Sequence, residues 1–220
     1  MTFVLSLKNL LKLRDNDSNF IGFDKYRKKG AYHWQEINTN PDYRSLIELV
    51  SQRLAPGMSV LDIGCGDGAY MGYVASRVAQ ATGIDADSEA VRLANREFKQ
   101  RGIGNCTAKN LTIGQAVQEF RSRGQEFDLI WSMDVIEHLP DPLELIHAAI
   151  GLVAEKGIVL IGTPLFITQE LVSPYHVKEY SLDEIRQIVK SVAPISSETI
   201  LPFRRKDNRI YEQGYYVCTI

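Results

Sequence analysis

The sequence has few cysteines, little net charge and no long apolar run, and each of these absences excludes a class of protein. The three cysteines, Cys65, Cys106 and Cys218, lack the spacing of a zinc or redox motif, and their odd number predicts reduced thiols. A formal net charge of −2 provides no general basic field for nucleic acid, so a nucleic-acid partner is not expected. No segment is long and apolar enough for a transmembrane helix.

The remaining composition is that of an ordinary globular protein. The 220 residues, 45% hydrophobic and 24% charged, suit one α/β domain with modest additions. We predict an N-terminal extension over residues 1–45 and a single domain over residues 46–220. The chain lacks an export signal, which favours a cytoplasmic protein, and we expect a monomer or a homodimer.

The first 14 residues have apolar side chains at helical spacing, with Lys8 and Lys12 between them. This pattern predicts an amphipathic arm that docks on the domain or on another subunit. Weak attachment to a membrane surface is the alternative.

Strand and helix patterns alternate along the rest of the chain. Short apolar runs predict strands over 59–64, 81–85, 106–110, 127–133 and 157–162, and helical patterns fall over 69–79, 88–101, 113–123, 143–154 and 182–192. Two further strands, 197–203 and 211–219, have no helix between them and predict an antiparallel hairpin. The expected fold is α/β, a seven-stranded, mostly parallel sheet with helices on both faces.

A glycine-rich turn follows the first predicted strand. Gly64, Gly66 and Gly68 permit a tight turn and let a ligand approach the backbone, and the next helix begins beside them. Asp85 ends the second strand about 20 residues later, as expected for a carboxylate that binds ribose hydroxyls. The spacing predicts a cofactor that contains a nucleoside.

The turn formally satisfies the dinucleotide pattern G-x-G-x-x-G/A, so an NAD-dependent oxidoreductase is one interpretation. Asp62 argues against it, because a carboxylate two residues before the first glycine would repel a pyrophosphate but suit an ammonium group. Gly68 also fits a G-x-G-x-G turn.

The segment 60–68 resembles motif I of the class I S-adenosylmethionine (SAM) methyltransferases, which have a Rossmann-like fold. In that family the glycine loop wraps the methionine end of SAM, and the acid after the second strand holds the ribose. The resemblance places the cofactor on residues at the ends of four strands: Asp62, Gly64, Cys65, Gly66, Asp85, Ala86, Asn110, Leu111 and Met133. We expect the thiol of Cys65 to pack rather than react.

A second motif, Met-Asp-Val-Ile-Glu-His-Leu-Pro-Asp-Pro, follows the fourth strand. Asp141 and Pro142 have a structural explanation, because they suit the N-cap and first turn of the next helix. Asp134, Glu137 and His138 have none. On a helical turn their i, i+3, i+4 spacing would bring two carboxylates and an imidazole together.

This second motif resembles the corresponding segment of the ubiquinone-biosynthesis O-methyltransferases and of the broader group around them. In those enzymes and in the small-RNA 2′-O-methyltransferases, a carboxylate-x-x-Glu-His arrangement binds a divalent metal beside the SAM methyl group. The resemblance therefore implies such a metal in this protein. Asp134, Glu137, His138 and the later His176 would hold it here, with Mg²⁺ or Zn²⁺ as candidates. The alternatives are His138 or His176 as a metal-free general base, with Glu137 orienting the histidine, or purely structural roles.

Three smaller signals surround this site. The aromatic cluster Tyr32, His33 and Trp34 either lines the cofactor or substrate pocket or packs the extension onto the domain. The basic run 204–206 is either a solvated turn or a phosphate site. The long loop 163–180 is predicted to select the substrate.

The function predicted from these residues is SAM-dependent O-methylation of a small molecule: a sugar, a quinone precursor or a secondary metabolite. An RNA 2′-O-methyltransferase and a non-catalytic SAM-binding subunit are the alternatives, ahead of an NAD oxidoreductase.

Overall fold

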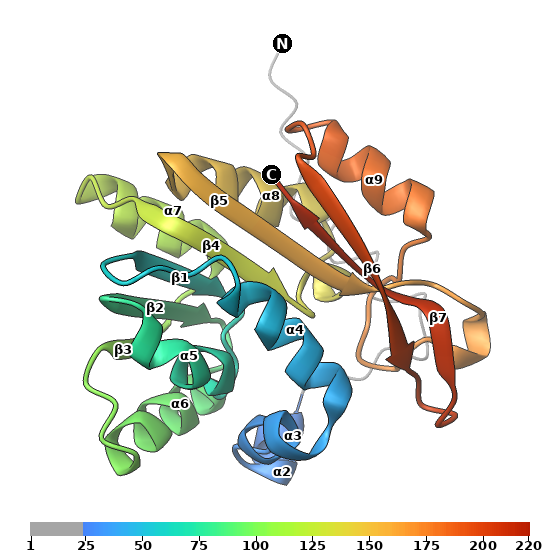
Figure 1. The fold of residues 1–220 in the computed structure, drawn as a ribbon, viewed down its shortest axis with the longest axis horizontal. Helices are drawn as coiled ribbons and strands as arrows, with labels where there is room; N and C mark the ends of the chain where they lie inside the picture. Colours follow the sequence, from blue (N-terminus) through green and yellow to red (C-terminus); the bar gives the residue numbers. More distant parts are fainter. Residues whose placement is uncertain (1–23) are drawn as a thin grey trace, which may run out of the picture.

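The computed structural model describes residues 24–220, so the predicted amphipathic arm lies outside the described residues. One seven-stranded sheet forms the centre of this part of the chain, in the order β3-β2-β1-β4-β5-β7-β6 (Figure 1). The strands are β1 (Ser59–Ile63), β2 (Gln80–Asp85), β3 (Cys106–Asn110), β4 (Phe127–Met133), β5 (Val153–Pro164), β6 (Ser197–Arg204) and β7 (Ile210–Thr219).

The first five strands run parallel to one another. The last two form the predicted antiparallel hairpin, in which β7 pairs antiparallel with both β5 and β6. The prediction of a mostly parallel seven-stranded sheet with a C-terminal hairpin is therefore confirmed.

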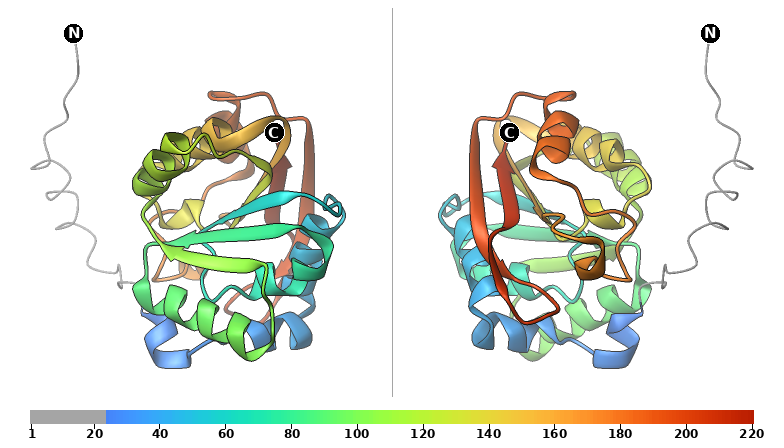
Figure 2. Two further views of the ribbon diagram at one scale, coloured as in Figure 1. Left: turned by 90° about the vertical axis from the view of Figure 1, so that its left-hand side faces the viewer. Right: turned by 90° about the vertical axis from the view of Figure 1, so that its right-hand side faces the viewer.

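Helices cover both faces of the sheet (Figure 2). They are α2 (Lys25–Lys29), α3 (His33–Thr39), α4 (Pro41–Ser51), α5 (Ala69–Val74), α6 (Ser88–Gln100), α7 (Ile113–Ser122), α8 (Pro142–Leu152) and α9 (Leu182–Lys190), with short 3-10 turns at Ala75–Arg77, Ile136–His138 and Gln169–Leu171. Helices α4, α5 and α6 share one apolar core with the sheet. Helices α7, α8 and α9 share a second core on the opposite face.

Side-chain caps set several helix starts. Asp141 accepts a hydrogen bond from the amide of Leu143 at 3.0 Å, which confirms the predicted N-cap of α8. The helix predicted from residue 88 is α6, and the residue before it supplies the N-cap. Asp87 is the cap, because its carboxylate accepts from the amide of Glu89 at 2.9 Å and Ser88 already lies within α6.

Some boundaries also differ from those predicted. The helix expected over 69–79 ends at Val74 and continues as the 3-10 turn Ala75–Arg77. The helix expected to reach residue 154 ends at Leu152, and β5 begins at once at Val153. The proposed boundary between extension and domain falls inside α4, whose Leu46, Ile47 and Val50 are fully buried in the first core.

The topology creates a crevice at one edge of the sheet. Strands β1 and β4 are neighbours, and the helices that follow them, α5 and α8, belong to opposite faces. In open α/β sheets, ligands bind at the carboxyl ends of the strands where the connections diverge in this way. The two predicted motifs follow β1 and β4, so both lie at this crevice.

Candidate active site

The glycine loop after β1 needs its glycines. Gly64, Gly66 and Gly68 have φ angles of 80°, 54° and 75°, in the left-handed region that favours glycine. A Cβ on Gly64 would collide with the side chain of Val135, and one on Gly66 would collide with the hydroxyl of Tyr26. The loop is therefore packed between the segment after β4 and the N-terminal extension.

Two cavities meet at this crevice. The larger, of about 510 Å³, extends from the glycine loop towards the β6–β7 hairpin, and the smaller, of about 300 Å³, lies between the ends of β1 and β2. Residues common to both linings are Tyr26, Gly64, Asp134, His138 and Tyr175. A ligand the length of a nucleoside with an attached amino acid could therefore extend from one cavity into the other.

Most of the predicted cofactor residues line these cavities. Asp85, Ala86 and Leu111 line the smaller cavity, where Ile84 also contributes. Asp62, Cys65, Gly66 and Met133 line the larger one. Asn110 is placed differently, because its amide group donates to the carbonyl oxygens of Asp85 and Ala86, each at 3.0 Å. It supports the turn after β2 and is not part of either lining.

Two carboxylates in the crevice, the buried Asp62 and the half-buried Asp85, suit a ligand with hydroxyl and ammonium groups. Burial raises the pKa of Asp85, and hydrogen bonds from the amides of Asp87 and Gly66 oppose that shift. Burial also raises the pKa of Asp62 well above its usual range. A nearby cation would favour the charged form of Asp62 and lower this pKa again. The residues present therefore fit the polar groups of a SAM molecule.

Glu137 belongs to the second motif, and its side chain is fully buried. Its Oε2 accepts a 3.0 Å hydrogen bond from the hydroxyl of Thr163, whereas Oε1 is buried without a hydrogen-bond partner among the described residues. Burial and the nearby Asp134 raise the pKa of Glu137 well above its usual range. Such an acceptor suits a proton or a cation.

His138 and His176 lie side by side in the crevice. Their ring centroids are 4.8 Å apart and the rings are nearly perpendicular, at 85°. Nδ1 of His138 lies 2.8 Å from the carbonyl oxygen of Tyr175, so this nitrogen carries the hydrogen and Nε2 holds the lone pair of the neutral ring. Burial, followed by the nearby His176, lowers the pKa of His138 to about 4.

Three of the four predicted metal ligands form a compact group. Glu137, His138 and His176 each offer one ligand atom, and these atoms lie within 4.8 Å of one another. Asp134 is not in that group. The helical turn expected to include it does not form, because Asp134 has a φ of 58° and the 3-10 turn begins only at Ile136.

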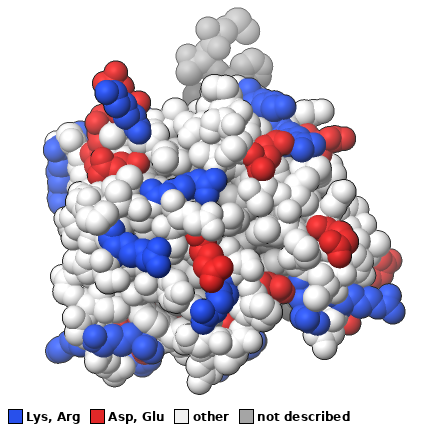
Figure 3. All heavy atoms as spheres, viewed as in Figure 1, with Lys and Arg blue, Asp and Glu red and all other residues white. Residues whose placement is uncertain are grey.

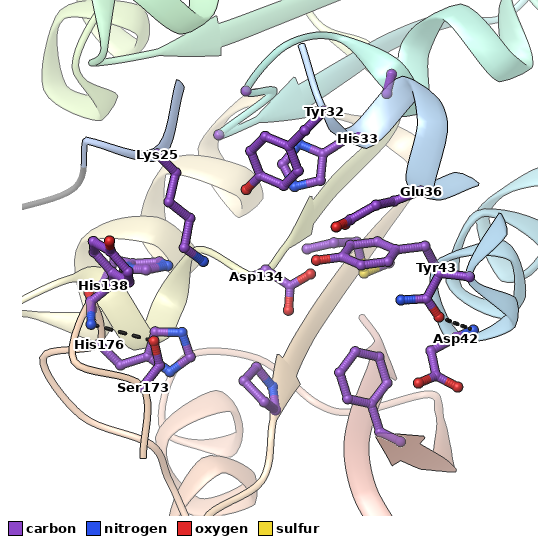
Figure 4. Close-up of a pocket in the computed structure, with 18 of the residues that line it drawn as sticks. Lys25, Tyr32, His33, Glu36, Asp42, Tyr43, Asp134, His138, Ser173 and His176 are labelled. Carbon is purple, nitrogen blue, oxygen red and sulfur yellow. Dashed lines mark hydrogen bonds between the residues drawn. The ribbon is translucent and has the colours of Figure 1, made fainter. Parts of the chain in front are cut away.

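Asp134 instead faces both cavities. Figure 4 shows it between Lys25 on one side and Glu36 and Tyr43 on the other, with its carboxyl group in the open space of the larger cavity. Burial raises the pKa of Asp134. Burial also lowers the pKa of Lys25, although the charges of Asp134 and Glu36 oppose that shift.

The aromatic cluster of the extension divides between its two predicted roles. Tyr32 and His33 line the larger cavity. Trp34 packs edge-on against Phe98 and donates from Nε1 to the carbonyl oxygen of Asp67 at 2.9 Å. The buried carboxylate of Asp67 also accepts from the amide of His33 at 3.0 Å, which ties the extension to the glycine loop.

The basic run in the β6–β7 hairpin is only partly solvated, because Arg204 and Lys206 are exposed and Arg205 is buried. Arg205 is buried and donates to the carbonyl oxygen of Leu165 at 3.0 Å, and it pairs with the buried Glu179. The amide of Arg204 donates to Asp42 at 2.9 Å, and Lys206 donates to the carbonyl oxygen of Val172 at 2.9 Å. These contacts hold the hairpin against loop 163–180 and helix α4.

Sequence reasoning did not single out several residues of the crevice. Lys25, Tyr26 and Tyr43 come from the N-terminal helices, and no motif marks them. Tyr175 and Glu179 flank the predicted His176 within the loop expected to select the substrate. Their closeness to that histidine in the sequence is the only signal that could have found them.

The family profile described as a methyltransferase domain matches residues 34–192. The chain belongs to this methyltransferase family. A ubiquinone biosynthesis O-methyltransferase from Actinobacillus pleuropneumoniae serotype 5b is 30% identical over 148 residues, which are 64% of this chain and 62% of that protein. One from Nitrosomonas europaea is 30% identical over 142 residues, covering 60% and 58% of the two chains. The methyltransferase-family chain thus spans about three fifths of the length of these relatives.

Solved structures of other methyltransferases share the fold. A SAM-dependent methyltransferase from Aquifex aeolicus has a TM-score of 0.66 at 18% identity, covering 90% of this chain and 97% of that one. The N-methyltransferase NodS from Bradyrhizobium japonicum, in complex with S-adenosyl-L-homocysteine, has a TM-score of 0.62 at 18% identity, with 84% and 89% covered. At these identities the similarity shows that the methyltransferase has their fold.

Proposed function

We propose that this methyltransferase transfers the methyl group of SAM to a hydroxyl oxygen of a small molecule. The observation that carries the proposal is the pair of joined cavities at the carboxyl ends of β1 and β4. The smaller cavity has the carboxylate of Asp85, and the larger one has Asp62, His138 and His176. Cofactor groups and acceptor groups would therefore meet near His138, which lines both.

The cofactor would extend across both cavities. Asp85 would bind the ribose hydroxyls, and Ile84, Ala86 and Leu111 would contact the adenine ring in the smaller cavity. Asp62 would face the ammonium group of the methionine moiety from the larger cavity. When bound, SAM supplies an electrophilic methyl group on a sulfonium.

The histidines would then accept the proton of the acceptor hydroxyl. Nε2 of His138 or His176 would take the hydroxyl proton as the methyl group moves from the sulfonium of SAM to the acceptor oxygen, with S-adenosylhomocysteine as the second product. The lowered pKa keeps the ring of His138 unprotonated at neutral pH, and it also makes the ring a weaker base than an ordinary histidine. Positioning of the two reactants supplies much of the remaining rate enhancement.

The size and charge of the site favour a small acceptor. The larger cavity, of about 510 Å³, is in the range of ordinary small-molecule pockets. On the face drawn in Figure 3, basic and acidic side chains are interspersed, without the basic stripe that an RNA substrate favours. The names of the ubiquinone-biosynthesis relatives support an O-directed reaction on a quinone precursor.

A metal-dependent form of the same reaction is the second candidate. The grouping of Glu137, His138 and His176 supports it, together with Oε1 of Glu137, which has no hydrogen-bond partner within residues 24–220. Mg²⁺ or Zn²⁺ held there would lower the pKa of an acceptor hydroxyl. Asp134 would not be a ligand in the geometry described above.

One assay separates these mechanisms. EDTA-treated protein is incubated with SAM labelled in its methyl group and with catechols, sugars or other vicinal-hydroxyl compounds, and transfer is counted with and without Mg²⁺ or Zn²⁺. The base mechanism predicts transfer that EDTA does not reduce. Transfer only after a metal is restored would support the metal-dependent form. SAM binding without transfer to any acceptor would contradict the proposal and favour a non-catalytic subunit.

A further inference from the structure

We propose that Glu179, held by Arg205, is a positioning residue that locks His176 in one tautomer, with the hydrogen on Nδ1 and the lone pair on Nε2. The inference rests on the proposed function in one respect: the lone pair on Nε2 would take the proton of the hydroxyl group that is methylated. Neither Glu179 nor Arg205 belongs to the two motifs that identify the cofactor site.

The contact between His176 and Glu179 determines which ring nitrogen carries the hydrogen. Nδ1 of His176 lies 2.8 Å from Oε1 of Glu179, whose side chain is fully buried. An ionised carboxylate only accepts hydrogen bonds, so Nδ1 must donate. The amide of Ser173 donates to the same oxygen at 3.2 Å.

Arg205 keeps this carboxylate charged and in place. It reaches Glu179 from the tip of the β6–β7 hairpin, and only 5% of its side chain is exposed. Its guanidinium also donates to the carbonyl oxygens of Leu165 at 3.0 Å and Leu171 at 3.3 Å. The three acceptors fix the orientation of the guanidinium. Arg205 donates to Oε2 of Glu179, and His176 is bonded to Oε1 of the same carboxylate.

The backbone around His176 is held as firmly as its ring. The amide of His176 donates to the carbonyl oxygen of Ser173 at 3.0 Å, and the amide of Val177 donates to that of Glu137 at 2.8 Å. The ring lines the larger cavity and lies beside His138. Because the backbone of His176 and its Nδ1 are both fixed by hydrogen bonds, only Nε2 can face a methyl-acceptor molecule in the cavity.

The direct test is the tautomer of His176 in the full chain, read from long-range ¹H–¹⁵N NMR correlations of protein labelled with ¹⁵N-histidine, at pH 8. The sequence has four histidines, and loss of one ring system in His176→Gln assigns the signals. We expect a protonated Nδ1 and an unprotonated Nε2. A ring protonated at Nε2 in the unmodified protein would overturn the proposal, whatever the activity.

Variants test the roles of the two partners. Glu179→Ala should give a mixture of tautomers and a fall in kcat of about tenfold to 100-fold, the usual effect of losing such an orienting partner. Affinity for S-adenosylhomocysteine should stay within about threefold. Glu179→Gln keeps an acceptor oxygen, so it should restore the Nδ1–H tautomer in part. Arg205→Lys should have a tautomer mixture and a kcat between those of Glu179→Ala and those of the unmodified protein.

Glu170→Gln is the matched control, because Glu170 is exposed in the same loop. It should change neither the tautomer nor kcat. An unchanged tautomer in folded Glu179→Ala would contradict the proposal. Failure of the proposed function would appear separately, as absence of S-adenosylhomocysteine binding or methyl transfer while the tautomer remains as predicted.

Discussion

The backbone amide of Gly66 donates a 2.9 Å hydrogen bond to Oδ2 of Asp85. This bond ties the glycine loop after β1 to the carboxylate at the end of β2. Oδ1 of Asp85 accepts from the amide of Asp87 at 2.8 Å, so the same side chain also shapes the start of α6. One carboxylate thus organises two turns while it faces the smaller cavity.

Asp85→Ala should weaken the binding of S-adenosylhomocysteine by more than tenfold, because the ribose would lose its acceptor and the glycine loop would lose its anchor. Isothermal titration calorimetry measures the change. Asp183→Ala is the control, because this aspartate on α9 has a side chain that is 88% exposed. Equal affinity in the two variants would rule out the assignment of Asp85 to the ribose.

His138→Ala should lower kcat by about 100-fold or more, the contribution of a general base, while the affinity for S-adenosylhomocysteine changes by less than about threefold. Steady-state kinetics and calorimetry on the same preparation separate the two effects. His147→Ala is the matched control, because His147 is exposed on α8. If both histidine variants keep full turnover, His138 has no part in the chemistry.

His138 should also make the protein less stable in mild acid. Its pKa is lowered from 6.5 to about 4, mainly by burial, so between these values the unfolded chain binds more protons than the folded protein. The stability contributed by the neutral ring is complete above pH 6.5 and is lost as the pH falls towards 4.

Urea unfolding at pH 7 and pH 5 in the presence of EDTA measures this effect. The unmodified protein should lose on the order of 1–2 kcal/mol more than His138→Gln over that interval. Equal losses in the two proteins would show that another group carries the acid sensitivity.

Asp67→Ala should detach the N-terminal extension from the glycine loop. Its buried carboxylate accepts from the amide of His33 and lies 3.3 Å from the Nδ1 of the same residue. Removing it should reduce the free energy of unfolding by about 1–3 kcal/mol. Affinity for S-adenosylhomocysteine should fall too, because Tyr26 of the extension covers Gly66. Calorimetry that finds full affinity would limit Asp67 to a role in stability.

The parts of the fold that local sequence determines were predictable. The apolar run of β4 and the three glycines after β1 marked their positions within a residue. Asp141 and Pro142 gave the start of α8 because capping depends on neighbours in the chain. Asp62 and Asp85 could be placed at the crevice because parallel strands end at a common edge.

The remaining parts depend on contacts between distant segments. The φ of 58° at Asp134 departs from the helical turn suggested by its spacing, and it separates this carboxylate from Glu137 and His138. Arg205 forms a buried ion pair with Glu179, which lies 26 residues away in the sequence. The basic segment 204–206 alone could not indicate this pair, because the partner comes from a different part of the chain. The N-terminal helices contribute Tyr26 and Lys25 to the crevice without any motif of their own.

The central claim is that the joined cavities bind the nucleoside cofactor of a methyltransferase. Calorimetric titration of EDTA-treated protein with S-adenosylhomocysteine, repeated with Mg²⁺ or Zn²⁺, tests it most directly. The account predicts binding in the micromolar range in both conditions. Absence of binding in both, together with binding of NADH in a fluorescence titration, would contradict it.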